Sequence, residues 1–227
     1  MAKLPPTRFD DTPILADGFP RDESPSLILK TTMLTQDSLT HDSLWKILTA
    51  VWLAGELALA LFTYTRSSQG KVQDRGTQLL LWVVIIGSFW IDGRMHDFLP
   101  SDMPGRHAVL RPLAIALFVV GLAIRATAIL TLGKAFSANV ATHAGQTLQR
   151  SGLYRLVRHP SYTGLEIIFL AIGLHSRTWA CLAVCFVPPT VALLYRIHVE
   201  EIALRRAFGP EYDDYARSTK RLIPGLY

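Results

Sequence analysis

Residues 160–198 read PSYTGLEIIFLAIGLHSRTWACLAVCFVPPTVALLYRIH, and this stretch decides the fold. It contains two apolar runs, at about 160–175 and 178–198, that are joined by only His175, Ser176 and Arg177. Neither run alternates polar with apolar residues as a half-buried strand does, so both are predicted to be helices. So short a connection predicts that they run antiparallel as a tight C-terminal helical hairpin.

Three further apolar runs precede the hairpin, at about 44–65, 78–91 and 109–132. The first would reach about 33 Å as a helix, which suffices for a hydrocarbon layer of about 30 Å. Helices satisfy their own backbone hydrogen bonds in lipid, where open sheets cannot. The predicted fold class is therefore an all-α integral membrane bundle of about five transmembrane helices.

Two of these runs are irregular. The run at 160–175 is short and contains Glu166, and the last run contains Pro188-Pro189, which predicts a bend or a partly unwound turn. Glu56 in the first run and Arg125 in the third are costly in lipid, so each is expected to face the bundle or to reach the interface. A Glu56–Arg125 pair is compatible with this pattern but is not required by it.

The N-terminal 43 residues differ in composition from the rest of the chain. The whole chain is 50% hydrophobic and 18% charged with a net charge of +5, whereas this segment has five prolines and four basic against seven acidic side chains. Residues 1–43, with a net charge of −3, are therefore predicted to be a disordered polar tail. Residues 44–227 carry a net charge of +8 and are predicted to form the membrane domain. The two cysteines, Cys181 and Cys185, are interpreted as small buried hydrophobes.

Basic residues in the loops predict the orientation of the bundle. With five spans, the side that contains the C-terminus carries twelve Lys and Arg residues against eight on the other side. Short cytoplasmic loops carry such an excess, so the C-terminal segment 199–227 is predicted to lie in the cytoplasm. Because the basic residues flank the spans, they favour attraction to a membrane surface and not nucleic-acid binding.

The loop before the hairpin has the densest group of polar residues in the chain. Arg158 and His159 precede the helix, Pro160 begins it, and Tyr162 and Glu166 follow one turn apart. Pro160 suits the first helical turn and holds His159 in an extended conformation. This group is either a ligand site or an ordinary basic loop at a membrane surface, and physical reasoning from the residues leaves both open.

A second polar group follows the last apolar run. Glu200 and Glu201 are adjacent carboxylates just inside the membrane boundary, where they can meet a cationic ligand. Alternatively, they form ordinary helical pairs four residues apart, Arg196–Glu200 and Glu201–Arg205.

Together these motifs resemble the isoprenylcysteine carboxyl methyltransferase family and, more broadly, membrane methyltransferases that include phospholipid N-methyltransferases. The resemblance covers about 132–227 and rests on Gly152-Leu-Tyr-Arg-Leu-Val-Arg-His-Pro-Ser-Tyr-Thr-Gly164, Glu200-Glu201, Phe208-Gly209 with Tyr212 and Tyr215, and Arg221-x-Ile-Pro224. The first two spans match only as apolar helices.

The resemblance implies an S-adenosylmethionine-dependent methyltransferase whose site lies at the cytoplasmic face. It implies that the cofactor is bound by Arg158, His159, Pro160, Tyr162, Gly164, Glu200 and Glu201, with Gly164 in a tight turn that admits the ligand. Arg221, Glu201 and His159 are the expected catalytic residues. An acceptor carboxylate needs only a cation such as Arg221, whereas a thiol or amine needs His159 or a glutamate to take its proton.

The acceptor and the activity have alternatives. A prenylated cysteine, a phospholipid amine, a small thiol and a quinone-like or isoprenoid acid all suit a pocket that opens to the bilayer. An NADPH-dependent enzyme like the sterol reductases and a non-catalytic membrane protein are the competing functions. No metal is expected, because Asp92, Arg94, His96 and Asp97 suit a solvated loop better than a metal site.

Overall fold

The computed structural model describes residues 25–66, 71–74, 76–99, 103, 109–133, 140–142, 148–176 and 178–227. The chain divides into two compact units, residues 1–39 and 40–227. The described part of the first unit is helical from Pro25 onward and belongs to α1 (Pro25–Arg66). The second unit holds the remainder of α1 and all other described elements, which are β1 (Lys71–Asp74), α2 (Gly76–Phe98), α3 (Arg111–Leu132), β2 (Val140–Thr142), the 3-10 helix η4 (Gly152–Arg155), α4 (Pro160–His175), α5 (Trp179–Phe208) and α6 (Pro210–Ser218).

The N-terminal helix starts earlier than the composition predicted. Residues 25–43, which were assigned to the disordered tail, are part of α1. Pro25 occupies the first helical position, where its missing N–H costs nothing, and no further proline follows before Arg66. The predicted disorder of residues 1–24 concerns a segment outside the described residues.

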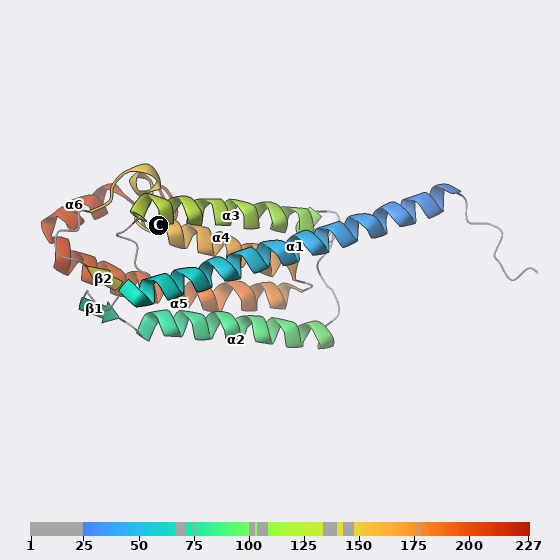
Figure 1. Ribbon diagram of the computed structural model, residues 1–227, viewed down its shortest axis with the longest axis horizontal. Coiled ribbons are helices and arrows are strands. Elements are labelled where there is room, and N and C mark those ends of the chain that lie inside the picture. Colours follow the sequence, from blue (N-terminus) through green and yellow to red (C-terminus); the bar gives the residue numbers. More distant parts are fainter. Residues whose placement is uncertain are drawn as a thin grey trace, which may run out of the picture. The chain divides into compact units, whose positions relative to one another are not determined.

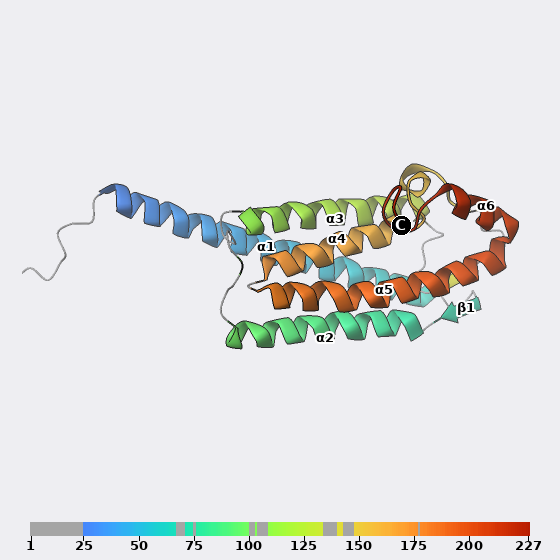
Figure 2. The ribbon, with the colours of Figure 1, turned by 180° about the vertical axis from the view of Figure 1, so that it is seen from behind.

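The bundle of the second unit is built from pairs of neighbouring helices. Helix α3 lies along α4, and α5 packs between α4 and α2 (Figure 1 and, from behind, Figure 2). Strand β1 pairs antiparallel with β2 in a short two-stranded ribbon. This ribbon, α6 and the C-terminal residues lie at the same end of the bundle (Figure 1).

The structure confirms the predicted membrane bundle of helices, with one difference in span length. Four described helices have a segment long and apolar enough to cross a membrane, namely Asp42–Leu61, Gly76–Met95, Arg111–Leu132 and Trp179–Phe208. Helix α4 has the predicted bounds, but its 16 residues reach only about 24 Å and fall short of a hydrocarbon layer of about 30 Å.

The C-terminal hairpin is confirmed, and its second helix is longer than predicted. The Thr178 side chain caps α5 by accepting a hydrogen bond from the Cys181 amide at 3.0 Å. Helix α5 runs continuously through Pro188-Pro189 and ends only at Gly209, whose φ of 54° lies in the left-handed region. Ten residues that were assigned to the C-terminal segment therefore extend this helix, and Glu200 and Glu201 lie on it.

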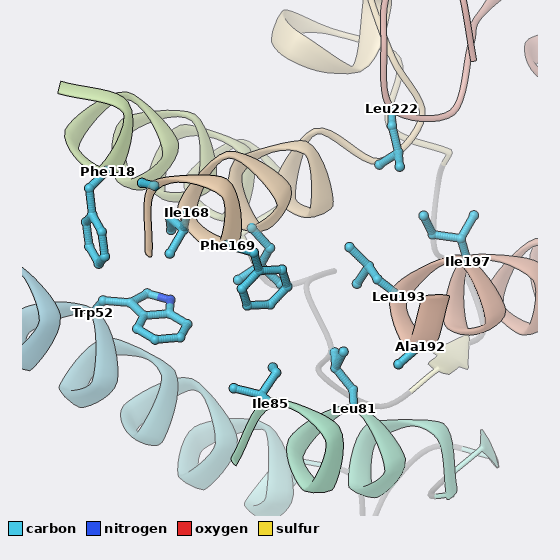
Figure 3. Close-up of a cluster of buried hydrophobic side chains, with 12 residues drawn as sticks. Trp52, Leu81, Ile85, Phe118, Ile168, Phe169, Ala192, Leu193, Ile197 and Leu222 are labelled. Atoms are coloured by element: carbon cyan, nitrogen blue, oxygen red, sulfur yellow. The ribbon is translucent and has the colours of Figure 1, made fainter. Parts of the chain in front are cut away.

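Aromatic side chains form the centre of the core. The Trp52 ring of α1 meets Phe118 of α3 and Phe169 of α4 edge to face, at centroid distances of 6.2 and 6.5 Å (Figure 3). Leu193 and Ile197 of α5 continue this cluster toward the end of the bundle where Leu222 lies (Figure 3). The core therefore reaches the C-terminal segment and holds it against the helices. Cys181 and Cys185 are free and buried, as predicted.

Candidate functional site

The C-terminal segment is paired with the loop before α4. The Arg158 amide donates to the Lys220 carbonyl at 2.7 Å, and the His159 amide donates to the Arg221 carbonyl at 3.0 Å. The Thr163 hydroxyl donates to the Leu222 carbonyl at 2.8 Å. These bonds bring Arg158 and His159 next to Arg221, which is about 60 residues away in the sequence.

Helix α6 contacts the same loop and η4 through hydrogen bonds. Its buried Tyr215 donates its hydroxyl to the Tyr154 carbonyl of η4 at 2.7 Å, and burial raises the pKa of Tyr215 to about 12. The phenol therefore stays protonated as a donor at neutral pH. The Arg158 guanidinium donates to the carbonyls of Ala216 and Thr219 at the end of α6.

Glu201 is the centre of the site. Its side chain is fully buried, with 0% exposed, and its carboxylate accepts from Arg158 at 3.0 Å and from Arg221 at 2.8 to 3.2 Å. Arg205, one turn further along α5, lies 3.8 Å away and forms the predicted pair. Hydrogen bonding to Glu201 raises the pKa of Arg221 above its ordinary value. We call Glu201 with Arg158, Arg205 and Arg221 the arginine cluster.

The arginine cluster carries excess positive charge. Three guanidinium groups face one carboxylate, and Asp213, which pairs with Arg205 at 3.3 Å, leaves the cations still in excess. The Arg205 and Arg221 side chains are 44% and 31% exposed, so parts of both reach the surface. An anionic group is therefore the ligand that this cluster favours.

His159 lies beside the cluster. Its side chain is 4% exposed, and its ring stacks on Tyr162 at a centroid distance of 5.6 Å. The Nε2 atom lies 3.6 Å from a Glu201 oxygen, and it has no hydrogen-bond partner among the described residues. A buried imidazole nitrogen of this kind is suited to bind a ligand atom, because an unmade hydrogen bond is costly.

Tyr162 and Glu200 belong to a second network, which adjoins the first through the His159–Tyr162 stack. The Tyr162 hydroxyl donates to Glu200 at 2.7 Å and accepts from Arg196 at 2.8 Å. Arg196 also donates to the Thr77 hydroxyl of α2 at 3.0 Å. The predicted Arg196–Glu200 pair is thus bridged by a phenol, and the adjacent glutamates of α5 serve different networks.

Gly164 is not in the predicted tight turn. It lies inside α4 and faces α3, where a Cβ atom would stand 2.7 Å from the Gly121 carbonyl and 2.8 Å from the Arg125 amide nitrogen. Its lack of a side chain serves close helix packing. The sequence motif was compatible with either use of a glycine, and only the position of α3 distinguishes them.

Several functional contacts were outside the reach of sequence reasoning. Arg196 and Arg205 were considered only as surface partners, and nothing pointed to Thr77 or to the carbonyls at the end of α6. Asp92 and Arg94, which were assigned to a loop, lie in α2. Asp92 accepts a hydrogen bond from the Ser176 hydroxyl at 3.0 Å, and the His96 and Asp97 side chains lie outside the described residues. No group of three metal-ligating side chains occurs in the described part of the chain.

We expect Tyr162→Phe to weaken the second network. The substitution removes a hydroxyl that joins Arg196 to Glu200, so buried polar atoms lose a partner at a cost of about 1–3 kcal/mol. Thermal unfolding in detergent measures the loss. Tyr195→Phe is the matched control, since Tyr195 is 52% exposed and precedes Arg196 on the same helix. Equal melting temperatures for the two variants would contradict this account.

The fold and the site define a multi-pass helical membrane protein with a carboxylate-anchored arginine cluster at one end of the bundle. The family resemblance is confirmed, because residues 114–206 match the isoprenylcysteine carboxyl methyltransferase (ICMT) family. The matched segment contains the loop before α4 and both glutamates of α5.

Individual relatives carry the same name. The chain is 33% identical over 127 residues to protein-S-isoprenylcysteine O-methyltransferase A of Arabidopsis thaliana, covering 52% of this chain and 61% of that protein. It is 31% identical over 118 residues to a probable protein-S-isoprenylcysteine O-methyltransferase of Oryza sativa subsp. indica, covering 49% of this chain and 60% of that protein. The chain therefore spans about three fifths of these plant relatives.

A solved structure shares the fold. It is described as the eukaryotic intramembrane Ras methyltransferase ICMT without a monobody, and it superposes with a TM-score of 0.54 at 24% identity. The match covers 68% of this chain and 55% of that chain.

Proposed function

We propose that the protein is an S-adenosylmethionine-dependent membrane methyltransferase, most similar to protein-S-isoprenylcysteine O-methyltransferases. The observation that carries the proposal is the arginine cluster, in which buried Glu201 holds Arg158 and Arg221 at the end of the bundle. The family match over residues 114–206 includes Arg158 and Glu201. The proposed acceptor is lipophilic and carries a carboxylate.

The residues present fit the charges of this cofactor. S-adenosylmethionine has a carboxylate beside a sulfonium and an ammonium group. The exposed parts of Arg205 and Arg221 and the unpartnered Nε2 of His159 offer contacts to an anion or acceptor atom. Glu200, joined to Tyr162, offers a carboxylate to a positive group. Pro160 holds the start of α4, while Gly164 contributes through packing against α3.

The chain's own residues have simple tasks in methyl transfer. The bound cofactor supplies an already activated methyl group, so the protein must mainly orient the acceptor and exclude water. A carboxylate acceptor is ionised near neutral pH, and Arg221 is the residue that we assign to hold it. Glu201 keeps Arg221 and Arg158 in place, and His159 borders the same space. For a thiol or amine acceptor, His159 would be the base.

The location of the reaction follows from the same proposal. The apolar outer faces of α1, α2, α3 and α5 contact lipid, and the arginine cluster lies at the cytoplasmic ends of the helices. A prenylated or other lipophilic acceptor then enters from the bilayer, whereas the cofactor enters from the cytoplasm.

Cofactor binding is the direct test. Isothermal titration of the purified full chain with S-adenosylhomocysteine should give a measurable Kd, and labelled S-adenosylmethionine should transfer its methyl group to an S-prenylated cysteine with a free carboxylate. Failure to bind S-adenosylhomocysteine would overturn the proposal. Binding of NADPH in its place would support the reductase-like alternative, and methylation of a phospholipid amine would change the acceptor.

We expect His159→Ala to weaken S-adenosylhomocysteine binding about tenfold. Loss of one hydrogen bond to a charged ligand costs about 1.5 kcal/mol, which corresponds to about a factor of ten in Kd. His198→Ala is the control, because His198 is exposed and lies on α5 only three residues from Glu201. An unchanged Kd for His159→Ala would remove His159 from the binding site.

A further inference from the structure

A further buried arginine, Arg125, lies between helices of the bundle and outside both polar networks described above. Arg125 of α3 donates through Nε and Nη2 to the two carboxylate oxygens of Glu56 of α1, the latter at 2.7 Å. Its remaining nitrogen, Nη1, donates to the Ser161 hydroxyl at 2.8 Å and to the Ser161 carbonyl at 3.3 Å. Each of the three residues is less than one tenth exposed. One guanidinium group therefore ties together α1, α3 and α4.

Helix cohesion alone does not account for this ion pair. Charged side chains are expensive within a membrane span, and apolar residues of similar volume hold helices together at less cost. The Arg125 guanidinium group also makes a hydrogen bond outside the ion pair, because its Nη1 atom donates to the Ser161 hydroxyl. The pair thus has a polar target on α4.

That target is the first turn of α4. Ser161 lies between Pro160 and Tyr162, next to His159, whose ring stacks on Tyr162. His159 is the N-cap residue of α4, but its side chain makes no capping hydrogen bond. Arg125, on the neighbouring helix α3, therefore anchors this turn by hydrogen bonds to Ser161.

The packing of α3 on α4 makes the contact possible. Gly121 and Gly164 face each other so closely that a Cβ on either would approach the backbone of the opposite helix to within 2.8 Å. The Arg125 amide nitrogen lies in the same contact. The guanidinium group is thereby brought to Ser161 at the beginning of α4.

We propose that Glu56 and Arg125 are positioning residues that hold the first turn of α4, and with it His159 and Tyr162, in the geometry that binds the cofactor. This inference rests on the proposed function. It makes α1 a working part of the site, although α1 lies outside residues 114–206 that match the family. Glu56 acts through Arg125, and Arg125 acts through Ser161.

The test separates positioning from stability with three variants of the full chain. Glu56→Gln leaves Arg125 without a charged partner, Glu56→Leu with Arg125→Met removes both charges, and Ser161→Ala removes only the hydroxyl. Glu211→Gln is the control, because Glu211 is an exposed carboxylate that pairs with Arg150 at 3.2 Å, outside this network. The melting temperature and the Kd for S-adenosylhomocysteine are measured for each.

We expect Glu56→Gln to lower the melting temperature and to raise Kd at least tenfold. The double variant should regain the melting temperature of the unmodified chain but keep the raised Kd. Ser161→Ala should raise Kd severalfold while it lowers the melting temperature less than Glu56→Gln does, and Glu211→Gln should leave Kd within twofold. If both the melting temperature and the Kd of the double variant equal those of the unmodified chain, the ion pair is only structural and the inference is wrong.

Hydrogen exchange gives a readout that needs no cofactor. The amides of Tyr162 and Thr163 donate to the His159 carbonyl at 3.0 Å each. A peptide covering residues 158–165 should exchange at least fivefold faster in the double variant and in Ser161→Ala than in the unmodified chain. Unchanged exchange would overturn the inference. If the unmodified chain itself does not bind S-adenosylhomocysteine, the proposed function is overturned instead.

Discussion

Glu201→Gln is expected to abolish measurable cofactor binding and to destabilise the protein by about 3–5 kcal/mol, the cost of breaking a buried ion pair. The neutral amide cannot balance the guanidinium groups of Arg158 and Arg221, which both donate to the carboxylate. Most of the lost stability comes from the pair with Arg158, because the Arg158 side chain is only 10% exposed. Arg205 is more exposed and contributes little, because water screens its charge.

The effect extends to ligand binding because Glu201 holds two residues from distant parts of the sequence. Without it, Arg221 loses its contact with α5, and the C-terminal segment keeps its backbone pairing with the loop before α4, the Thr163 hydrogen bond and the burial of Leu222. Arg158 and Arg221 then no longer present a fixed pair of donors to an anion.

Thermal unfolding in detergent and titration with S-adenosylhomocysteine measure the two effects. Glu211→Gln is the control, because Glu211 is 56% exposed and pairs with the exposed Arg150 at 3.2 Å. Removing such a surface pair should change stability by less than about 1 kcal/mol. A Glu201→Gln protein that unfolds and binds like the Glu211→Gln protein would contradict the role that we assign to the arginine cluster.

Gly164→Ala is expected to destabilise the bundle by about 3 kcal/mol, the upper end of the usual cost of overpacking. The added Cβ would lie 2.7 Å from the Gly121 carbonyl and 2.8 Å from the Arg125 amide nitrogen. Both are backbone atoms that cannot rotate away, so α3 and α4 must separate. Such separation would also draw Arg125 away from Ser161.

The matched control for this variant is Gly87→Ala. Gly87 lies inside α2, and a Cβ there meets nothing within 4 Å. Alanine in place of glycine in a helix should then stabilise the protein by up to about 1 kcal/mol. The two variants are compared by melting temperature in the same detergent. A Gly164→Ala protein that melts at the same temperature as the Gly87→Ala protein, or higher, would show that α3 and α4 do not approach as closely as described.

Local pattern was sufficient to predict most of the helices. The apolar runs gave the bounds of α4 and the hairpin, because helix type depends on residues within a few positions of one another. The ends of α1 and α5 were predicted less well. Composition marked residues 25–43 as polar, yet the segment has no proline after Pro25, and Glu200 and Glu201 continue α5 because nothing stops it before Gly209.

The candidate site was predicted as a set of residues but not as an arrangement. Arg158, His159 and Tyr162 on one side and Glu200, Glu201 and Arg221 on the other were recognised from motifs. Their division into two networks was not, since adjacent glutamates on a helix point in different directions and their partners come from other elements. The Gly164 turn was wrong for the same reason, because a glycine's role depends on what lies opposite.

The sequence by itself therefore determined that this protein is a helical membrane bundle, where its hairpin lies and which polar residues it keeps near one end of that bundle. Only the tertiary structure decided that Glu201 collects the arginines, that Tyr162 bridges Arg196 and Glu200, and that Arg125 joins Glu56 to Ser161. The physical reason is range. Helix formation and apolar burial are governed by neighbours along the chain, whereas a buried charge is satisfied by whichever partner the packing brings within about 3 Å.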